Sequence, residues 1–249
     1  MAKIKLSQIS TKPPEDLKKS KAKKATKKMI EEISEMQRVM FAQQKHSLLV
    51  VFQGMDASGK DGATRNVFGQ VNPAGCRVHS FKKPTDLEFA HDFLWRVHKE
   101  VPSKGYIQIF NRSHYEDILI QRVHKWIDMD TVKRRMEHIN NFEKLIQDQN
   151  NTTVIKFFLH VSQDEQLVRL NERKTIPRKF WKHNENDFKE REHWEAYMEA
   201  YEDCIEKCSP EIPWTIVPTD DNWYKEYLVA QTVYEAMADM NLEYPGMKK

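Results

Sequence analysis

One short stretch limits the fold of this chain more than any other: an apolar run leads directly into a glycine-flanked loop that ends in lysine. Residues 48–66 read LLVVFQGMDASGKDGATRN, and the stretch GMDASGK matches the pattern G-x-x-x-x-G-K. In a phosphate-binding loop of this kind, backbone N–H groups and the start of a helix hold anionic oxygens, and the lysine adds a point charge. The apolar run before the motif and the helical pattern after it are the context that such a loop requires. The predicted phosphate-binding residues are Gly54, Ala57, Ser58, Gly59 and Lys60.

The loop departs from the common pattern at the residue after its lysine. Asp61 stands where such loops usually carry Ser or Thr, and Asp56 adds a second carboxylate inside the loop. Two carboxylates beside a phosphate cradle would repel the ligand unless metal ions or a dense group of cations lie between them. For Asp56 we favour such a functional role. For Asp61 a simple preference of carboxylates for the first turn of a helix is an equal alternative.

Apolar segments of strand length alternate with segments of helical pattern along the chain. The first and fourth are near-continuous apolar runs, as expected of strands that helices cover on both faces. This alternation predicts an α/β fold in three α/β/α layers around a mostly parallel sheet. No repeat or low-complexity linker interrupts residues 1–249, so we expect a single domain. The predicted strands are Leu48–Gln53, Cys76–Phe81, Tyr106–Phe110, Val154–Val161 and Pro213–Val217.

A second polar cluster follows the third predicted strand, where the sequence reads YIQIFNRSHYED. The carboxyl ends of parallel strands meet at one edge of a sheet, where folds of this class assemble their sites. Arg112 could share charge with a phosphoryl group in transfer, and Glu116 or Asp117 could hold Mg²⁺ or its waters. A structural ion pair is the alternative for Arg112. For Asp117 we favour a helix cap over a metal ligand.

The segment before the last predicted strand is long and charged, and we expect a helical lid over about residues 168–192, broken at Pro177. Residues 168–182 carry a net charge of +5. Cationic side chains on one helix face repel one another unless an anion joins them, so the lid is predicted to face a polyanion. A solvated charged helix is the alternative. The basic residues are Arg169, Arg173, Lys174, Arg178, Lys179 and Lys182, and beyond them Trp194, Tyr197, Tyr201 and Ile205 have the spacing of a buried helical stripe.

Charge is distributed unevenly between the N-terminal segment and the rest of the chain. Residues 1–28 contain ten lysines against Glu15 and Asp16, so this segment carries +8 and leaves −5 for the remainder of a chain whose formal net charge is +3. A basic arm on an acidic body favours a polyanionic partner, with a solvated helix face as the alternative. From Pro14 onward the pattern predicts one long helix that ends by about residue 45. Exposed apolar residues on this helix would serve a dimer.

Some classes of protein are disfavoured by what the sequence lacks. The longest clean apolar run covers residues 48–52, far short of a membrane span, and the N-terminus has no apolar secretory segment. We therefore expect a cytoplasmic protein without a membrane partner. The three cysteines fit a reducing compartment, and Cys204 and Cys208 lack the second pair that a metal site needs. The ten histidines are scattered and form no metal-binding pattern.

Three segments together resemble the polyphosphate kinase 2 family: GMDASGKDG, FNRSHYED and ERKTIPRKFWK. The stretch NPAGCRVHSFKKPT, residues 72–85, is also similar to the family, and the resemblance extends over about residues 15–235. It implies a P-loop kinase fold like that of thymidylate kinase, with a helical lid and an N-terminal helical extension. It also implies that phosphoryl groups pass from inorganic polyphosphate to nucleoside mono- or diphosphates, with Mg²⁺ or alternatively Mn²⁺ as cofactor.

The resemblance further implies roles for residues at the matching positions. Catalysis would fall to Asp56, Lys60, Arg112 and Glu116. Asp61 would join the phosphate-binding loop, and Arg173, Lys174, Arg178, Lys179 and Lys182 would bind phosphate from the lid. The nucleotide would contact Lys82, Lys83, Asn111, Arg112 and Glu116, and the candidate metal ligands are Asp56, Asp61, Glu116 and Asp117. Many members have Asp at the position of Asn111 and Asn at that of Glu116, so the NRSHYE version resembles the subgroup that accepts both AMP and ADP.

The residues and the resemblance predict the same chemistry. The attacking oxygen of a nucleotide phosphate is already anionic, so positioning and charge neutralisation replace a strong general base. We expect polyphosphate, ADP or ATP, and AMP as partners, no nucleic acid, and a homo-oligomer. An ATP-dependent nucleoside monophosphate kinase shares the loop and the fold and is the main alternative. A nucleic-acid-binding P-loop protein is a weaker one, because the body is acidic and the basic stretches lack interleaved aromatic residues.

Overall fold

Five parallel strands form one sheet in the computed structural model of the protein, which describes residues 4–208 and 210–246. The strands lie in the order β2-β3-β1-β4-β5, and every neighbouring pair is parallel. All five predicted strands are confirmed to within two residues at each end. The predicted parallel α/β class is confirmed with them. Their bounds are β1 Ser47–Gln53, β2 Cys76–Ser80, β3 Ile107–Asn111, β4 Thr152–His160 and β5 Trp214–Pro218.

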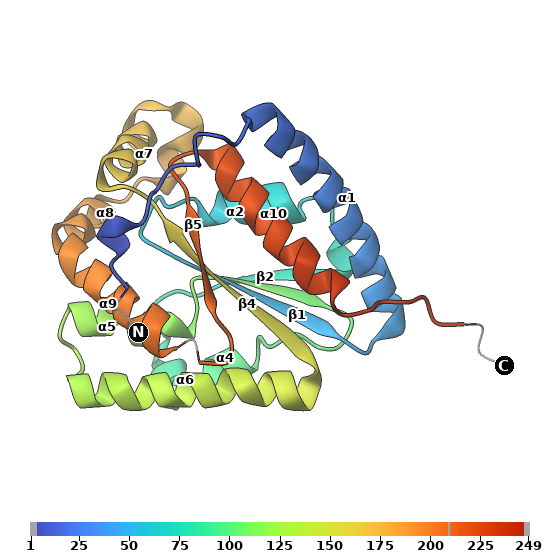
Figure 1. The fold of residues 1–249 in the computed structure, drawn as a ribbon. Helices are drawn as coiled ribbons and strands as arrows, with labels where there is room; N and C mark the ends of the chain where they lie inside the picture. The colour runs from blue at the N-terminus through green and yellow to red at the C-terminus, as the bar shows by residue number, and fades with distance from the viewer. Residues whose placement is uncertain (1–3, 209, 247–249) are drawn as a thin grey trace.

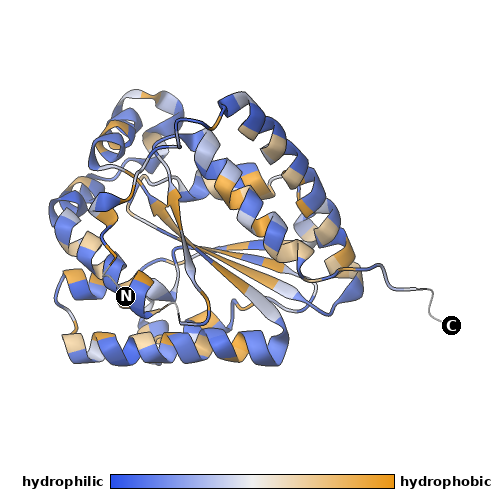
Figure 2. Ribbon diagram, in the orientation of Figure 1, coloured by the Kyte–Doolittle hydropathy of each residue, from blue (hydrophilic) through white to orange (hydrophobic). Residues whose placement is uncertain are grey.

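The continuous apolar run of β1 is explained by two separate cores, one on each face of the sheet. Leu48, Val50 and Phe52 pack in one core, and Leu49 and Val51 pack in the other. Side chains alternate between the faces of a strand, so a strand covered on both sides needs apolar residues at every position. Figure 2 shows orange, hydrophobic residues along the strands, whereas the surrounding helices carry hydrophobic and hydrophilic residues in turn.

Helices cover both faces and complete the three layers (Figure 1). One face packs against α1 (Lys19–Gln43), α2 (Lys60–Phe68) and α10 (Asn222–Ala238). The other packs against α4 (Trp95–His98), α5 (Ile120–Val123), α6 (Met129–Asn150) and α9 (Trp194–Lys207). The short α3 (Asp86–Phe89) follows β2, and α7 (Gln163–Thr175) and α8 (Glu185–Glu190) lie at the carboxyl edge of the sheet. The buried stripe predicted in α9 is confirmed, because Trp194, Tyr197, Tyr201 and Ile205 are each at most 9% exposed.

The N-terminal segment differs from the prediction of a helix beginning at Pro14. Helix α1 begins at Lys19, and the residues before it pack across α9 and the ends of β4 and β5. Leu6 is fully buried, its N–H donates to Glu202 at 2.9 Å, and its carbonyl oxygen contacts His160 Nε2 at 3.1 Å. Residues 14–17 form a separate turn, in which the Leu17 N–H donates to the Pro14 carbonyl oxygen at 3.2 Å. Lys18 is extended, with a φ of −71° and a ψ of 120°, so the helix begins only after it.

The predicted lid region contains the end of α7, a 3₁₀ segment (Pro177–Lys182) and α8. Helix α7 ends at Thr175, two residues before Pro177, which has no backbone N–H to donate to a continuing helix. Within the described ranges, no helix is long and apolar enough to cross a membrane. The three cysteines carry free thiols, as expected from the sequence.

Candidate active site

The phosphate loop lies between β1 and α2, and its two glycines are required by geometry. Gly54 has a φ of +148°, and a Cβ there would lie 2.7 Å from the Leu159 carbonyl oxygen. Gly59 caps α2 with a φ of +102°, a conformation that other residues rarely adopt. The loop therefore passes close to the neighbouring strand and turns its backbone toward the start of α2. This arrangement is the one that the G-x-x-x-x-G-K pattern predicts.

Lys60 closes this loop from the first turn of α2. Its side chain is buried, and its Nζ donates to the carbonyl oxygens of Gly54 at 2.7 Å and Met55 at 3.1 Å. Burial lowers the pKa of Lys60 to about 8, and the nearby Arg112 acts in the same direction. Asp56 and other carboxylates oppose this shift but do not cancel it. Lys60 is thus a cation held at the loop by carbonyl oxygens that a phosphate could replace.

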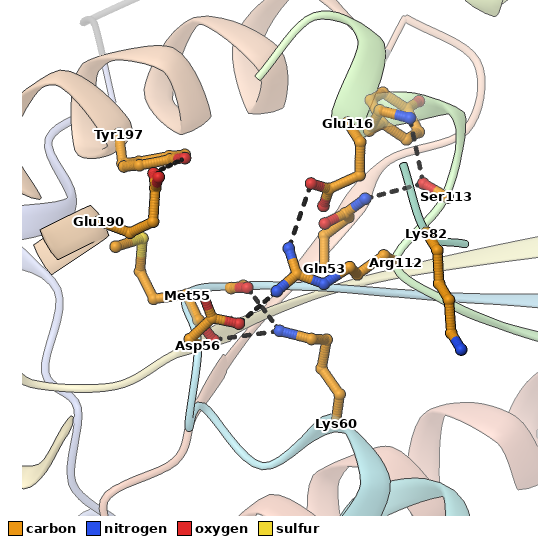
Figure 3. A network of polar contacts seen from close by, with 12 residues as sticks. Gln53, Met55, Asp56, Lys60, Lys82, Arg112, Ser113, Glu116, Glu190 and Tyr197 are labelled. Atoms are coloured by element: carbon orange, nitrogen blue, oxygen red, sulfur yellow. Dashed lines mark hydrogen bonds and ion pairs between the residues drawn. The ribbon is translucent and has the colours of Figure 1, made fainter. Parts of the chain in front are cut away.

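Arg112 connects the two acidic segments of the site, because it contacts both Asp56 and Glu116, which are 60 residues apart in the sequence. Its guanidinium pairs with Asp56 of the loop and with Glu116 at 3.2 Å (Figure 3). Its backbone has a φ of 60°, and its N–H donates to the Phe52 carbonyl oxygen at 3.1 Å, so the residue is fixed to the end of β1. The Glu116 carboxylate raises the pKa of Arg112 above its ordinary range, burial opposes the rise, and Asp56 adds to it. The guanidinium stays charged beside Lys60 at any relevant pH.

The buried side-chain amide of Gln53 contacts Glu116. Gln53, the last residue of β1, is fully buried and lies 2.9 Å from Ser113 Oγ. With its NH₂ group turned toward Glu116, the amide donates to that carboxylate at 3.0 Å and accepts from the Ser113 N–H at 3.1 Å. Gln53 therefore fixes the carboxylate that in turn holds Arg112.

Asp61 links the loop to the lid. Its carboxylate pairs with Lys182 and accepts a hydrogen bond from the Asn111 side chain at 2.7 Å. Partial burial acts to raise the pKa of Asp61, but Lys182, Asn111 and Lys60 hold it below its usual range. The carboxylate is therefore ionised and shared between lid and loop.

Asp117 is placed away from these groups. It is 4% exposed, its Oδ2 pairs with Arg96 at 3.2 Å, and its Oδ1 accepts from Gln121 at 2.7 Å. Burial raises its pKa, against the influence of Arg96. The predicted cap is wrong, since both carboxylate oxygens bind side chains. Arg96 also donates to the Lys82 carbonyl oxygen at 2.8 Å, so the pair positions the chain that carries Lys82 and Lys83, both of which are exposed.

Three of the six predicted lid cations are paired with carboxylates of the lid itself. Arg173 pairs with Asp187, Lys174 with Glu185 at 3.1 Å, and Lys179 with Glu172. Arg178 is exposed and has no acidic partner among the described residues. The lid thus contacts the loop through Lys182 and Asp61, with half of its predicted cations paired inside the lid.

Several residues at the site carried no clear signal in the sequence. Arg169, predicted only as a lid cation, donates to the carbonyl oxygens of Ala57 at 3.2 Å and Ser58 at 3.3 Å. Gln166 donates to the Asp56 carbonyl oxygen at 3.0 Å. Asp187 lies near enough to Asp56 to feel its charge, which adds to the effect of burial in raising the pKa of Asp187. A motif can reveal none of these, because each is defined by the fold that brings α7 and α8 to the loop.

Lys225 is a further residue of the site that belongs to no motif of the sequence. It is 1% exposed, and its Nζ lies 2.8 Å from where a Cβ on Gly59 would stand and 3.2 Å from one on Gly62. Burial lowers its pKa to about 8, with Arg169 acting in the same direction. Its Nζ donates to Asn222 at 2.8 Å. A second buried cation therefore lies against the end of the loop at Gly59 and Gly62.

Within the described ranges, no three histidine, cysteine or acidic side chains come together as a metal site. The Arg112 guanidinium is paired with both Asp56 and Glu116, and the Asp61 carboxylate is paired with Lys182. Basic side chains therefore alternate with carboxylates around the loop. This arrangement suits a metal ion that is bound partly by substrate phosphates better than one that is bound by protein ligands alone.

Comparison with known proteins identifies the family of this site. The family model described as polyphosphate kinase 2 matches residues 16–245. The chain belongs to the polyphosphate kinase 2 family. The predicted resemblance is thereby confirmed, and the polyphosphate kinase 2 fold accounts for the sheet, the loop and the lid.

Individual relatives agree with this membership. The chain is 46% identical over 214 residues to the AMP/ADP-polyphosphate phosphotransferase of Meiothermus ruber, covering 86% of this chain and 80% of that protein. It is 41% identical over 229 residues to the ADP-polyphosphate phosphotransferase of Rhodopseudomonas palustris, covering 87% and 79%. The crystal structure of polyphosphate kinase 2 from Arthrobacter aurescens TC1 superposes with a TM-score of 0.95 at 37% identity, covering 100% of this chain and 90% of that one.

Proposed function

We propose that this protein transfers a phosphoryl group from inorganic polyphosphate to ADP, giving ATP, and to AMP, giving ADP, in a reversible reaction. The observation that carries the proposal is the junction of Lys60, Arg112 and the Lys182–Asp61 pair at one phosphate loop in a member of the polyphosphate kinase 2 family. Relatives named for AMP/ADP and for ADP support the acceptors.

The residues of the site would act by positioning and charge. The loop N–H groups and Lys60 hold the reacting donor phosphate, and Arg112 faces the group in transfer. The acceptor phosphate oxygen is anionic without help, so the site needs no base of raised pKa. Glu116 and Gln53 orient Arg112, which lets a planar guanidinium contact two phosphate oxygens in a fixed geometry.

Magnesium fits the donor set of this site. Asp56, Asp61 and Glu116 supply oxygen ligands at the loop, and Mg²⁺ is commonly held by one or two carboxylates together with substrate phosphates. Bound there, the ion would neutralise charge on the phosphates. Mn²⁺ accepts the same ligands. Asp117, buried against Arg96, is the least suited of the four candidates.

Use of two acceptors is supported by two polar positions. Asn111 presents a neutral amide beside Asp61, and Glu116 presents a carboxylate beside Arg112. Lys82 and Lys83 are exposed at the same edge and free to meet an acceptor phosphate. AMP and ADP differ by one phosphate, so a site with several exchangeable cations suits both.

The setting of the enzyme is also part of the proposal. Free thiols at all three cysteines support a cytoplasmic location. A homo-oligomer is supported by exposed apolar side chains at Val78, Leu87 and Phe89. The sequence suggested such residues on α1, but among the described residues none of the large exposed hydrophobic side chains lies on that helix. No role in nucleic-acid binding is proposed.

A donor assay tests the proposal against the ATP-dependent alternative. AMP is supplied with Mg²⁺ and either long-chain polyphosphate or ATP, and ADP formation is followed. The proposal predicts ADP from polyphosphate in reactions that contain no ATP. Product from ATP but not from polyphosphate would assign the protein to the nucleoside monophosphate kinases instead. Replacing AMP by ADP in the same assay shows whether both acceptors are used.

A further inference from the structure

The first half of α1 carries an unusual density of unpaired charge. Residues 18–28 contain seven lysines and no acidic residue. We call this set the lysine ridge; its members are Lys18, Lys19, Lys21, Lys23, Lys24, Lys27 and Lys28. All seven are exposed, and among the described residues only Lys28 has a carboxylate partner, Glu32 at 3.4 Å. The ridge is therefore a strongly positive surface without internal compensation.

The placement of these lysines is electrostatically unfavourable for the isolated helix. The amino end of a helix carries partial positive charge, which favours acidic residues there, yet the first turn of α1 has none. Lys19, Lys23 and Lys27 follow one another at spacings of four, where like charges repel. The acidic residues of α1 stand in its second half, at Glu31, Glu32 and Glu35. A bound polyanion would relieve both repulsions.

The ridge lies at the edge of the sheet that carries the phosphate loop. Helix α1 ends at Gln43 and β1 begins at Ser47, so the helix runs antiparallel to the strand and its amino end reaches the carboxyl edge. Figure 1 shows this end of α1 beside the start of α10. Lys225, in the first turns of α10, is the buried cation behind Gly59 and Gly62 of the loop.

A chain of direct contacts connects the loop to the segment that enters the ridge. Arg169 bonds the loop carbonyl oxygens and also donates to the Asp220 carbonyl oxygen at 3.1 Å. The Asp220 side chain accepts from Thr11 Oγ1 at 2.7 Å, and its N–H donates to the Thr11 carbonyl oxygen at 3.1 Å. Thr11 is followed within seven residues by Lys18. The ridge is thus connected to the α10 side of the loop. In the sheet, β5, which leads to α10, and β3, which leads to Arg112, lie on opposite sides of β1.

We propose that the lysine ridge binds the part of the polyphosphate chain that extends beyond the reacting phosphates. The inference rests on the proposed function, because it takes the donor to be a polymer. In the proposed function the acceptor meets the loop from the side of Arg112 and Lys82, so a long donor would leave on the other side, where the ridge lies. A flexible chain of phosphates matches a row of point charges without aromatic side chains, whereas single-stranded nucleic acid is usually also stacked on such rings.

Chain-length dependence tests this proposal. The variant K21Q/K24Q/K27Q removes three ridge charges while keeping residues of similar helix propensity. The matched control, K45Q/K104Q/K133Q, removes three exposed charges elsewhere. Steady-state KM is measured for long-chain polyphosphate and for inorganic triphosphate as donors, with ADP as acceptor. Melting temperatures confirm that both variants fold.

The ridge variant is expected to raise KM for the long donor by about tenfold, as when several phosphate contacts are lost. Its kcat, its KM for ADP and its KM for triphosphate should stay unchanged, and the control should match the wild type throughout. Equal changes for long and short donors, or equal changes in both variants, would overturn the proposal. Lost affinity for single-stranded RNA with unaltered KM for long polyphosphate would assign the ridge to nucleic acid. Absence of transfer from any polyphosphate by the wild type would contradict the proposed function itself.

Discussion

The phosphate loop and the lid hold their charges in different ways. The loop is fixed by backbone contacts: Lys60, Arg169 and Gln166 all donate to its carbonyl oxygens. The lid is fixed by ion pairs between side chains, such as Lys182 with Asp61. The contacts from Arg169 and Gln166 of α7 hold the backbone of the loop in shape, whereas Lys60 can exchange its carbonyl oxygens for a phosphate. Ion pairs at the surface contribute little stability and can exchange partners, so the lid can trade its carboxylates for phosphates.

This difference has a consequence for which substitutions affect which parameter. Changes in the loop should remove interactions made with the reacting phosphate and lower kcat. Changes in the lid should weaken the hold on the donor chain and raise KM. The variants below test this division, in order of decreasing expected effect.

Replacement of Lys60 by alanine should have the largest effect. The variant removes the cation at the reacting phosphate, and we expect kcat/KM for polyphosphate to fall by about 10²–10³-fold. Steady-state kinetics with ADP measure the loss, and Lys45→Ala serves as a control at the other edge of the sheet. A loss of less than fivefold would mean that the loop does not hold the reacting group.

Arg112→Lys should follow, with a fall in kcat of about 10²-fold. Lysine keeps the charge but cannot contact Asp56 and Glu116 together as the guanidinium does. Single-turnover rates separate this step from product release. Near-normal rates would show that charge alone, without the fork geometry, is sufficient.

Lys182→Ala should change KM more than kcat. Lys182 bridges the lid to Asp61 of the loop, whereas Lys174 pairs with Glu185 within the lid. We expect KM for polyphosphate to rise about tenfold for Lys182→Ala and about threefold for Lys174→Ala, with a change in the free energy of unfolding below about 1 kcal/mol for each. A drop in kcat at constant KM would contradict the division between lid and loop.

The pH dependence should show the smallest effect. The pKa of Lys60 is lowered to about 8, so the charged form that binds phosphate is lost as the pH rises through that value. We expect kcat/KM for polyphosphate to be about half its plateau at pH 8, and the decline in kcat to occur at higher pH because bound phosphate stabilises the ammonium group. Lys225 has a similarly lowered pKa, and Lys225→Met distinguishes the two lysines. If kcat/KM no longer falls at alkaline pH in the Lys225→Met variant, the fall in the wild type is caused by Lys225 and not by Lys60.

Much of this architecture is predictable from local pattern. The strands stand out because burial on both faces requires unbroken apolar runs, and the loop because Gly54 and Gly59 have backbone angles or contacts that exclude other residues. The lid charge is also visible in sequence. Its pairing is not, because Asp187 meets Arg173 only through the turn at Pro177, and side-chain partners across a turn leave no periodic signal.

Residues that act through distant contacts are the ones that pattern misses. Asp117 looked like a helix cap because it precedes a helix, but Arg96 reaches it from a separate helix. The start of α1 was placed five residues early because lysine and glutamate favour helices, whereas residues 14–17 form a turn and Lys18 is extended. Lys225 lies more than 160 residues from the loop it supports.

The most direct test of the account is ATP formation from ADP by the purified protein, with long-chain polyphosphate and Mg²⁺ as the only other additions. The account predicts ATP in proportion to enzyme, and its near-complete loss with Lys60→Ala. Equal ATP from the wild type and Lys60→Ala, or none from the wild type, would contradict a polyphosphate-dependent transfer at this loop.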